Sequence, residues 1–117
     1  MATQQDLIKQ AMQDLGVLGN NEDPSAEDFA TAGDRYTQRL EMLVDDNYAD
    51  WDADSIPDAA MPGIRRVIAY EIAPMFGVLK SDLVEPDGKT LEEKGLSLLR
   101  RYMRKKASYE ETFVDWF

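Results

Sequence analysis

The sequence contains neither cysteine nor histidine among its 117 residues. Without cysteine the chain has no disulfide scaffold, thiolate nucleophile, iron–sulfur cluster or zinc ribbon. Without histidine it lacks both the commonest general base and the commonest metal ligand. These two absences exclude most hydrolase triads and zinc enzymes, and the sequence indicates no cofactor.

Long hydrophobic runs are also missing. No apolar stretch approaches the roughly 18–20 residues that a membrane span requires. The N-terminal segment MATQQDLIKQ is polar and does not have the basic-then-apolar pattern of a signal peptide. We therefore expect a soluble protein that stays in a cytoplasm and has no membrane partner.

Basic side chains are scarce in the first half of the chain. The formal net charge is −10, and residues 1–60 hold three basic side chains against fourteen acidic ones. Such an acidic half repels phosphates and therefore disfavours a free-standing nucleic-acid binder. The length fits one domain, and a hydrophobic content of 44% is enough for a small core.

The basic side chains of the second half cluster near its end, at Arg100, Arg101, Arg104, Lys105 and Lys106. One interpretation is that these cations complement the dipole at the C-terminal end of a helix. The other is that they form an interaction surface, and they are the only plausible phosphate-facing patch of the chain.

Apolar residues recur at helical spacing in four stretches, while strand patterns are nearly absent. The first begins at Thr3 and stops at Gly16, and the second begins at Ser25 and keeps one apolar face toward Val44 and Tyr48. The third covers roughly 63–76, where Pro74 kinks it or ends it early. The fourth begins near Thr90. We predict an all-α domain, a small bundle of about four helices over residues 1–106, followed by an extended C-terminal tail over 107–117.

An acidic connector separates the second and third helices. Its residues Asp50, Asp52, Asp54 and Asp58 occupy positions 1, 3, 5 and 9 of an EF-hand-like loop. The glycine and glutamate that such a loop needs at positions 6 and 12 are replaced by Ser55 and Met61. A solvated acidic loop is therefore the favoured interpretation, and a Ca²⁺ site is the alternative.

No pair of carboxylates lies in an apolar setting that would suit acid–base catalysis, so we expect no enzyme and assign no catalytic residue.

The C-terminal tail is more informative, because it combines aromatic and acidic residues. Its aromatics either complete the core of the domain or dock into a partner. Docking is the favoured hypothesis, with anchors at Tyr109, Phe113, Trp116 and Phe117.

Four stretches of the chain together resemble a known family: 6–18 with its Leu-Gly-Val end, 24–28 followed by 40–43, 51–59, and 68–77. In order and spacing they are similar to the head-to-tail adaptor, or connector, proteins of tailed bacteriophages. The resemblance covers about residues 3–77 and extends more weakly to the fourth helix.

The resemblance implies a structural protein of the virion neck that is assembled in the host cytoplasm. It would form a ring of about twelve copies beneath the portal protein, extend the DNA channel and provide the platform for the next tail or nozzle protein. An acidic bore fits this role, because packaged DNA then passes without specific binding. By the same family analogy, the aromatic tail would bind the portal.

Within such a ring, the basic cluster could meet the acidic second helix of a neighbouring copy. We expect Arg100, Arg101 and Arg104 on one side of this contact and Asp45 and Asp46 on the other. Two rival functions stay open. The chain could be an acidic DNA mimic or helical interaction protein that binds a nucleic-acid-binding partner, or a small helix-turn-helix regulator, for which no recognition helix is evident.

Overall fold

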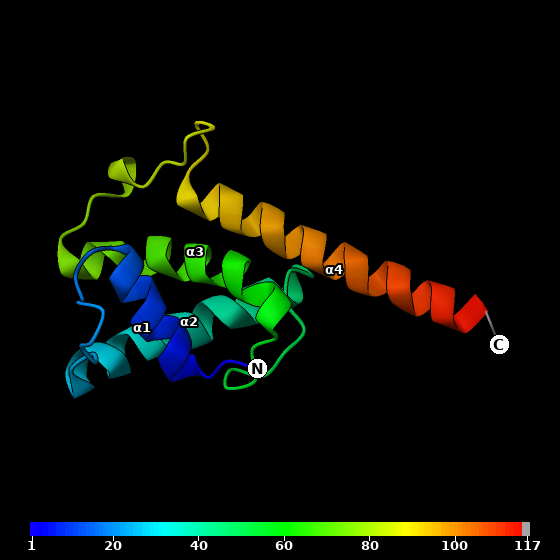
Figure 1. Cartoon of the computed structure of the whole chain (residues 1–117), viewed down its shortest axis with the longest axis horizontal. Coiled ribbons are helices and arrows are strands. Elements are labelled where there is room, and N and C mark those ends of the chain that lie inside the picture. Colours follow the sequence, from blue (N-terminus) through cyan, green and yellow to red (C-terminus); the bar gives the residue numbers. More distant parts are fainter. Residues whose placement is uncertain (116–117) are drawn as a thin grey trace.

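The computed structural model consists of four α-helices joined by loops and short 3₁₀ turns (Figure 1). The structure describes residues 1–115, and for residues 107–115 it describes the backbone alone. The helices are α1 (Gln4–Asp14), α2 (Ala26–Asp45), α3 (Met61–Ile72) and α4 (Leu91–Asp115). The described residues contain no strand, only two isolated antiparallel bridges, so the predicted all-α fold is confirmed.

Both N-terminal helices begin where the sequence predicts. Thr3 caps α1 in a capping box with Asp6, and Ser25 caps α2 by accepting a hydrogen bond from the backbone of Asp28. The end of α2 was less predictable. The helix stops at Asp45 because Asn47 adopts a left-handed conformation (φ 64°) and the backbone N–H of Tyr48 returns to the carbonyl of Leu43.

The third helix ends early, as the position of Pro74 predicts. After Ile72 the backbone tightens into a 3₁₀ turn over Ala73–Phe76, and Gly77 reverses the chain at a φ of +73°. A proline ring removes one backbone donor and crowds the preceding turn, so a regular α-helix cannot continue through it. The chain then runs through a long loop to the start of α4.

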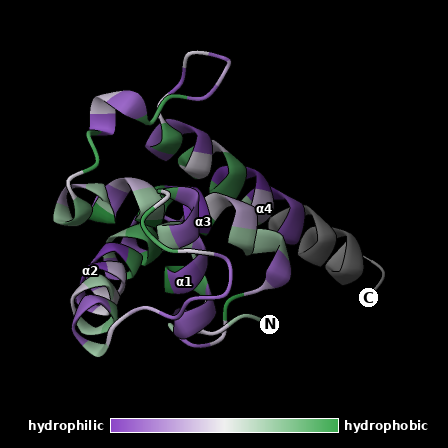
Figure 2. Cartoon of the chain, turned by 60° about the vertical axis from the view of Figure 1, so that its left-hand side comes forward, coloured by the Kyte–Doolittle hydropathy of each residue, from purple (hydrophilic) through white to green (hydrophobic). Residues whose placement is uncertain are grey.

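The core lies around α3, which packs against each of the other three helices. Every apolar residue on its inner face is fully buried, and Leu7 and Ile8 of α1 and Tyr36 and Leu43 of α2 close the core from the other side. No charged or polar side chain is buried among residues 1–106. In Figure 2 hydrophobic residues of α3 lie in the middle of the bundle, under hydrophilic residues on the surrounding segments.

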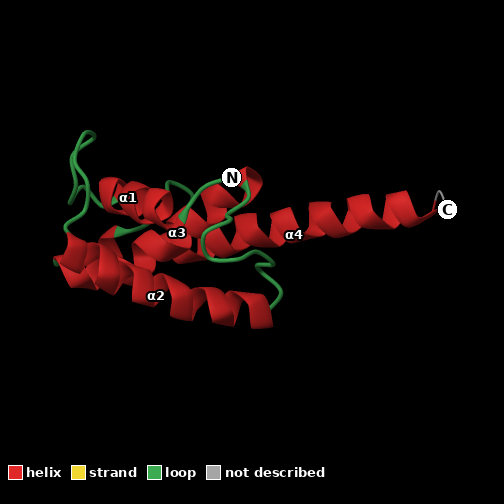
Figure 3. Cartoon of the chain, turned by 90° about the horizontal axis from the view of Figure 1, so that it is seen from below, coloured by secondary structure: helices red, strands yellow, loops and turns green. Residues whose placement is uncertain are grey.

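The longest helix, α4, packs on α3 with its first half and then leaves the bundle. Thr90 caps it in a second capping box with Glu93, where the sequence predicts its start. Figures 1 and 3 show its C-terminal part extending well past the other helices. The sequence separates a tail from residue 107 onward, whereas the backbone of that segment continues α4 as far as Asp115.

Candidate interaction surfaces on α4 and α2

The connector after α2 fixes α4 at the point where it leaves the bundle. The hydroxyl of Tyr102 donates to Asp50 at 3.2 Å, and the ammonium of Lys106 is hydrogen-bonded to the same carboxylate. Two residues before Tyr102, Arg100 donates to the hydroxyl of Tyr48 at 2.7 Å and lies over its ring. Residues 48–50 therefore grip α4 through three of its side chains.

Aromatic packing between the buried Trp51 and the half-buried Tyr102 supports these contacts. Trp51 meets Tyr102 edge to face, and its indole N–H donates to the hydroxyl of Tyr36 at 3.3 Å. Tyr36 in turn donates to the carbonyl of Ala53 at 3.0 Å. Burial raises the pKa of Tyr36 to about 12, and burial together with the nearby Asp50 carboxylate raises the pKa of Tyr102.

The acidic connector does not gather its carboxylates around one point. Asp50 faces Tyr102 and Lys106, Asp54 accepts from the backbone of Gln4, and Asp58 lies 3.5 Å from the N-terminal ammonium. Among the described residues there is no group of three or more acidic side chains placed to hold a metal ion. In this structure, Asp50, Asp54 and Asp58 instead form separate contacts with α4, the start of α1 and the N-terminus.

The outward face of α4 carries the basic cluster. Arg101, Arg104 and Lys105 are exposed, and within residues 1–106 they form no salt bridge. Arg100 differs from them, because it is already engaged with Tyr48 of its own chain. Of the three arginines expected at a contact between copies, Arg101 and Arg104 thus form no salt bridge with the side chains that the structure describes. Of the tail residues expected to bind the portal, Tyr109 and Phe113 lie outside the described side chains, and Trp116 and Phe117 lie outside the described residues.

A groove lies beside these cations, in the middle of α4 where the helix leaves the bundle. It has a volume of about 450 Å³, a floor of Ala59, Pro62, Leu98 and Tyr102, and a rim of Arg101, Lys105 and Lys106. Charge counting along the sequence cannot find this groove, because Ala59 comes from the 3₁₀ turn before α3 and Pro62 from the first turn of α3. We call these seven residues the α4 groove.

The C-terminal end of α2 has the opposite character. Asp45 and Asp46 are exposed, and the last turn of the helix contains no basic residue. The sequence predicts Val44 on the inner face, but 43% of this residue is exposed, and Met42 beside it is 53% exposed. The prediction for Val44 is wrong. Leu43 faces the core, and Val44 follows it about 100° further around the helix, so its side chain faces outward. We call residues 41–46, which are exposed except for Leu43, the α2 end.

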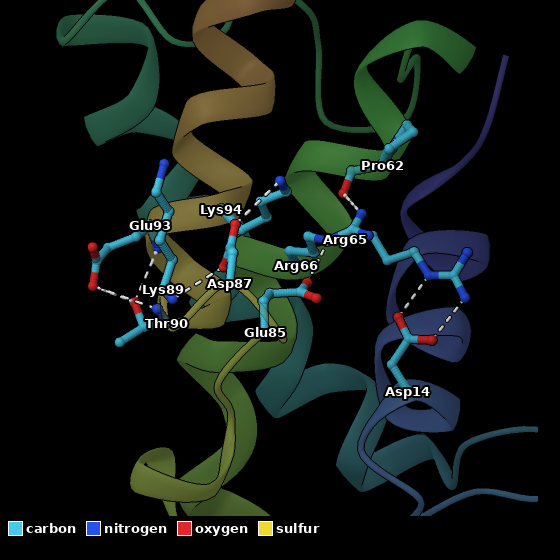
Figure 4. A network of polar contacts seen from close by, with 10 residues as sticks. All are labelled: Asp14, Pro62, Arg65, Arg66, Glu85, Asp87, Lys89, Thr90, Glu93 and Lys94. Atoms are coloured by element: carbon cyan, nitrogen blue, oxygen red, sulfur yellow. Dashed lines mark hydrogen bonds and ion pairs between the residues drawn. The ribbon is translucent and has the colours of Figure 1, made fainter.

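A larger hollow of about 600 Å³ lies between α1, α3 and the loop before α4. Four of its charged residues form two pairs (Figure 4). Arg65 donates two hydrogen bonds to Asp14, at 2.6 and 2.7 Å, which raises the pKa of the guanidinium. Arg66 donates to Glu85 at 3.0 Å and to the carbonyl of Pro62 at 2.8 Å. These pairs tie the loop and α1 to α3.

Finally, none of the helices in the described part of the chain is long and apolar enough to cross a membrane. Comparison of the sequence with protein-family models and with curated proteins, and of the fold with solved structures, gave no match.

Proposed function

We propose that the chain is a head-to-tail adaptor, a non-enzymatic structural protein of the neck of a tailed-phage virion. In this role, copies of the chain form a ring below the portal protein, extend the DNA channel and present a platform to the next tail component. The family resemblance over residues 3–77 supports the proposal, and so does the physical character of the surface.

The observation that carries the proposal is the separation of unlike charges on one small chain. Arg101, Arg104 and Lys105 lie on the helix that leaves the bundle, whereas Asp45 and Asp46 end α2 without a cation in the last turn. Two different, complementary surfaces on every copy give a head-to-tail contact, which closes into a ring when the rotation between copies allows it.

The remaining acidic surface suits the bore of a DNA channel. Residues 1–60 carry fourteen acidic side chains, and the exposed side of α2 includes Glu27, Asp34 and Glu41. A lumen of this sign repels phosphates, so a polyanion slides through it without being held.

The C-terminal segment with Tyr109, Phe113, Trp116 and Phe117 follows the part of α4 whose side chains are described and is the proposed contact with the portal.

The proposal is tested by imaging tail-less, portal-bearing heads with and without the purified chain. We expect a new ring of density under the portal vertex. A chain that lacks residues 109–117 should remain helical by circular dichroism but lose attachment. The variant Glu27→Gln, changed at an exposed site far from α4, is the matched control and should attach normally. Heads that show no added density with the intact chain would refute the proposal.

A further inference from the structure

The α4 groove combines an apolar floor with a basic rim. Its floor is built from four residues of three different segments, and its three rim residues are all cationic. Arg101 and Lys105 stand one turn apart on the exposed side of α4 and have no salt bridge within residues 1–106. The chemistry of such a groove suits an apolar side chain that is flanked by carboxylates.

The α2 end has this complementary chemistry. Met42 stands one turn before Asp45 and Asp46, so the three side chains share one face of the helix. The methionine is 53% exposed, and both aspartates are exposed as well. The carbonyl end of a helix carries partial negative charge, which makes two aspartates there unfavourable unless cations come from elsewhere. Within residues 1–106, neither aspartate has a cationic partner.

Within one chain the two surfaces are not paired, since no salt bridge joins Asp45 or Asp46 to Arg101 or Lys105. Arg100 contacts Tyr48 of the connector that follows α2, and therefore faces the chain's own connector. Arg101 follows it about 100° further around the helix, and the groove lies beyond it against Ala59 and Pro62. Arg101 thus points away from the side of α4 that Arg100 turns toward the chain's own connector.

We infer that the α4 groove binds the α2 end of a second copy of this chain. Met42 enters between Pro62 and Leu98, while Asp45 and Asp46 pair with Arg101 and Lys105. The contact is heterologous, so every copy offers one groove and one α2 end. The inference deepens the proposed function, because it assigns the surfaces that join neighbours in the ring.

Engineered cysteines test this contact cleanly, because the chain has none of its own. One copy carries Met42→Cys and the other carries Leu98→Cys, and the full-length proteins are mixed under mild oxidation. We expect a disulfide-linked heterodimer, since a bridge forms only when the two Cα atoms come within about 7 Å. A chain that carries both substitutions should give a ladder of linked multimers.

Leu79→Cys replaces Leu98→Cys in the matched control, because Leu79 is 65% exposed but lies outside the groove. Reversing the rim with Arg101→Glu and Lys105→Glu on the Leu98→Cys copy should lower the linked yield about tenfold. Adding Asp45→Lys and Asp46→Lys to the Met42→Cys copy should restore it. Failure of this restoration would overturn the assigned ion pairs.

Three other outcomes would overturn the inference: equal linking to the Leu79→Cys control, no linking at chain concentrations up to about 1 mM, or preferred linking of Leu98→Cys to Phe113→Cys. The last would assign the groove to the C-terminal segment.

All of these cross-linking experiments use the purified chain without portal or heads. A failed cross-link with a ring still visible under the portal would therefore reject this contact alone, whereas a successful cross-link without that ring would reject the neck function alone.

Discussion

Gly95 of α4 lies directly against the backbone of Gly63 in α3. A Cβ atom at Gly95 would stand 2.7 Å from the carbonyl oxygen of Gly63 and 3.0 Å from the backbone nitrogen of Val67. Both distances are shorter than van der Waals contact, and backbone atoms cannot move aside as a side-chain end can. The close crossing of α3 and α4 therefore depends on the missing side chain, and Leu99 is fully buried one turn further along α4.

We expect Gly95→Ala to lower the free energy of unfolding by about 1–3 kcal/mol, because the two helices must separate to admit the methyl group. This direction is opposite to the ordinary effect, since alanine in a helix interior is better than glycine by up to about 1 kcal/mol. Urea unfolding followed by circular dichroism measures the change.

Gly33→Ala in α2 is the matched control for that substitution. A Cβ there would meet Nε2 of Gln4, the free end of a flexible side chain that can shift, and would touch Ile8 only at an ordinary 3.7 Å. We expect this variant to be as stable as the wild-type chain or up to about 1 kcal/mol more stable. A Gly95→Ala chain that gains stability in the same way would show that glycine does not set the helix spacing.

Stability at alkaline pH should depend on Tyr36. Its pKa is raised from 10.0 to about 12 in the folded chain, because the phenol is fully buried. Between these two values the unfolded chain loses the phenolic proton while the folded chain keeps it, so stability falls as the pH rises. The stabilisation is complete below pH 10, and on the order of 2–3 kcal/mol is lost by about pH 12.

Denaturant unfolding at a series of pH values from 9 to 12 measures this loss, and Tyr36→Phe is the control. The variant lacks the titrating group, so its stability should fall much less over the same range. At neutral pH it should itself be less stable by about 1–3 kcal/mol, since the indole N–H of Trp51 and the carbonyl of Ala53 lose a partner. Parallel pH profiles for the two chains would contradict the assignment to Tyr36.

The loop between α3 and α4 should loosen without unfolding the bundle when Glu85 is changed. Glu85 accepts from Arg66, and Asp87 lies 3.5 Å from Lys94, so two ion pairs hold the loop to the adjoining helices. We expect Glu85→Gln to speed tryptic cleavage after Lys80 and Lys89 several-fold, while global stability changes by less than about 1 kcal/mol. Asp82→Asn in the same loop should leave the cleavage rate unchanged, and equal rates for both variants would refute the role of Glu85.

The helices could be predicted from the sequence because their boundaries depend on local chemistry. Thr3, Ser25 and Thr90 each offer a hydroxyl to the free N–H groups of a first turn, and Pro74 interrupts α3 through its own ring. The stop of α2 was harder to predict, since Asn47 has to adopt a left-handed conformation that asparagine tolerates but does not require.

The candidate surfaces depend on contacts between distant segments, and the sequence therefore predicts them only in part. Charge counting finds the cations of α4 and the aspartates at the end of α2. It cannot find that Arg100 is held by Tyr48, 52 positions away, or that Ala59 and Pro62 form the floor of a groove beside Arg101. Such pairings follow from how α3 and α4 cross.

The direction in which α4 leaves the bundle should depend on Asp50. Its carboxylate accepts from Tyr102 and pairs with Lys106, at the last point where α4 touches the connector. Asp50→Ala removes both contacts, and we expect a stability loss of only about 1 kcal/mol, because the ion pair and the tyrosine hydrogen bond both lie at the surface.

Local motion should respond more strongly than stability to this substitution. Amide hydrogen exchange at residues 100–106 should speed up about tenfold in Asp50→Ala, while exchange in α1 and α3 stays unchanged, because only the outer part of α4 loses its support. Asp52→Ala is the matched control, since Asp52 is an exposed aspartate of the same connector and, within residues 1–106, is not the partner of Arg100, Tyr102 or Lys106 in the bonds that hold α4. If both variants exchange at the wild-type rate, α4 is held by its packing on α3 alone, and the grip of residues 48–50 does not orient it.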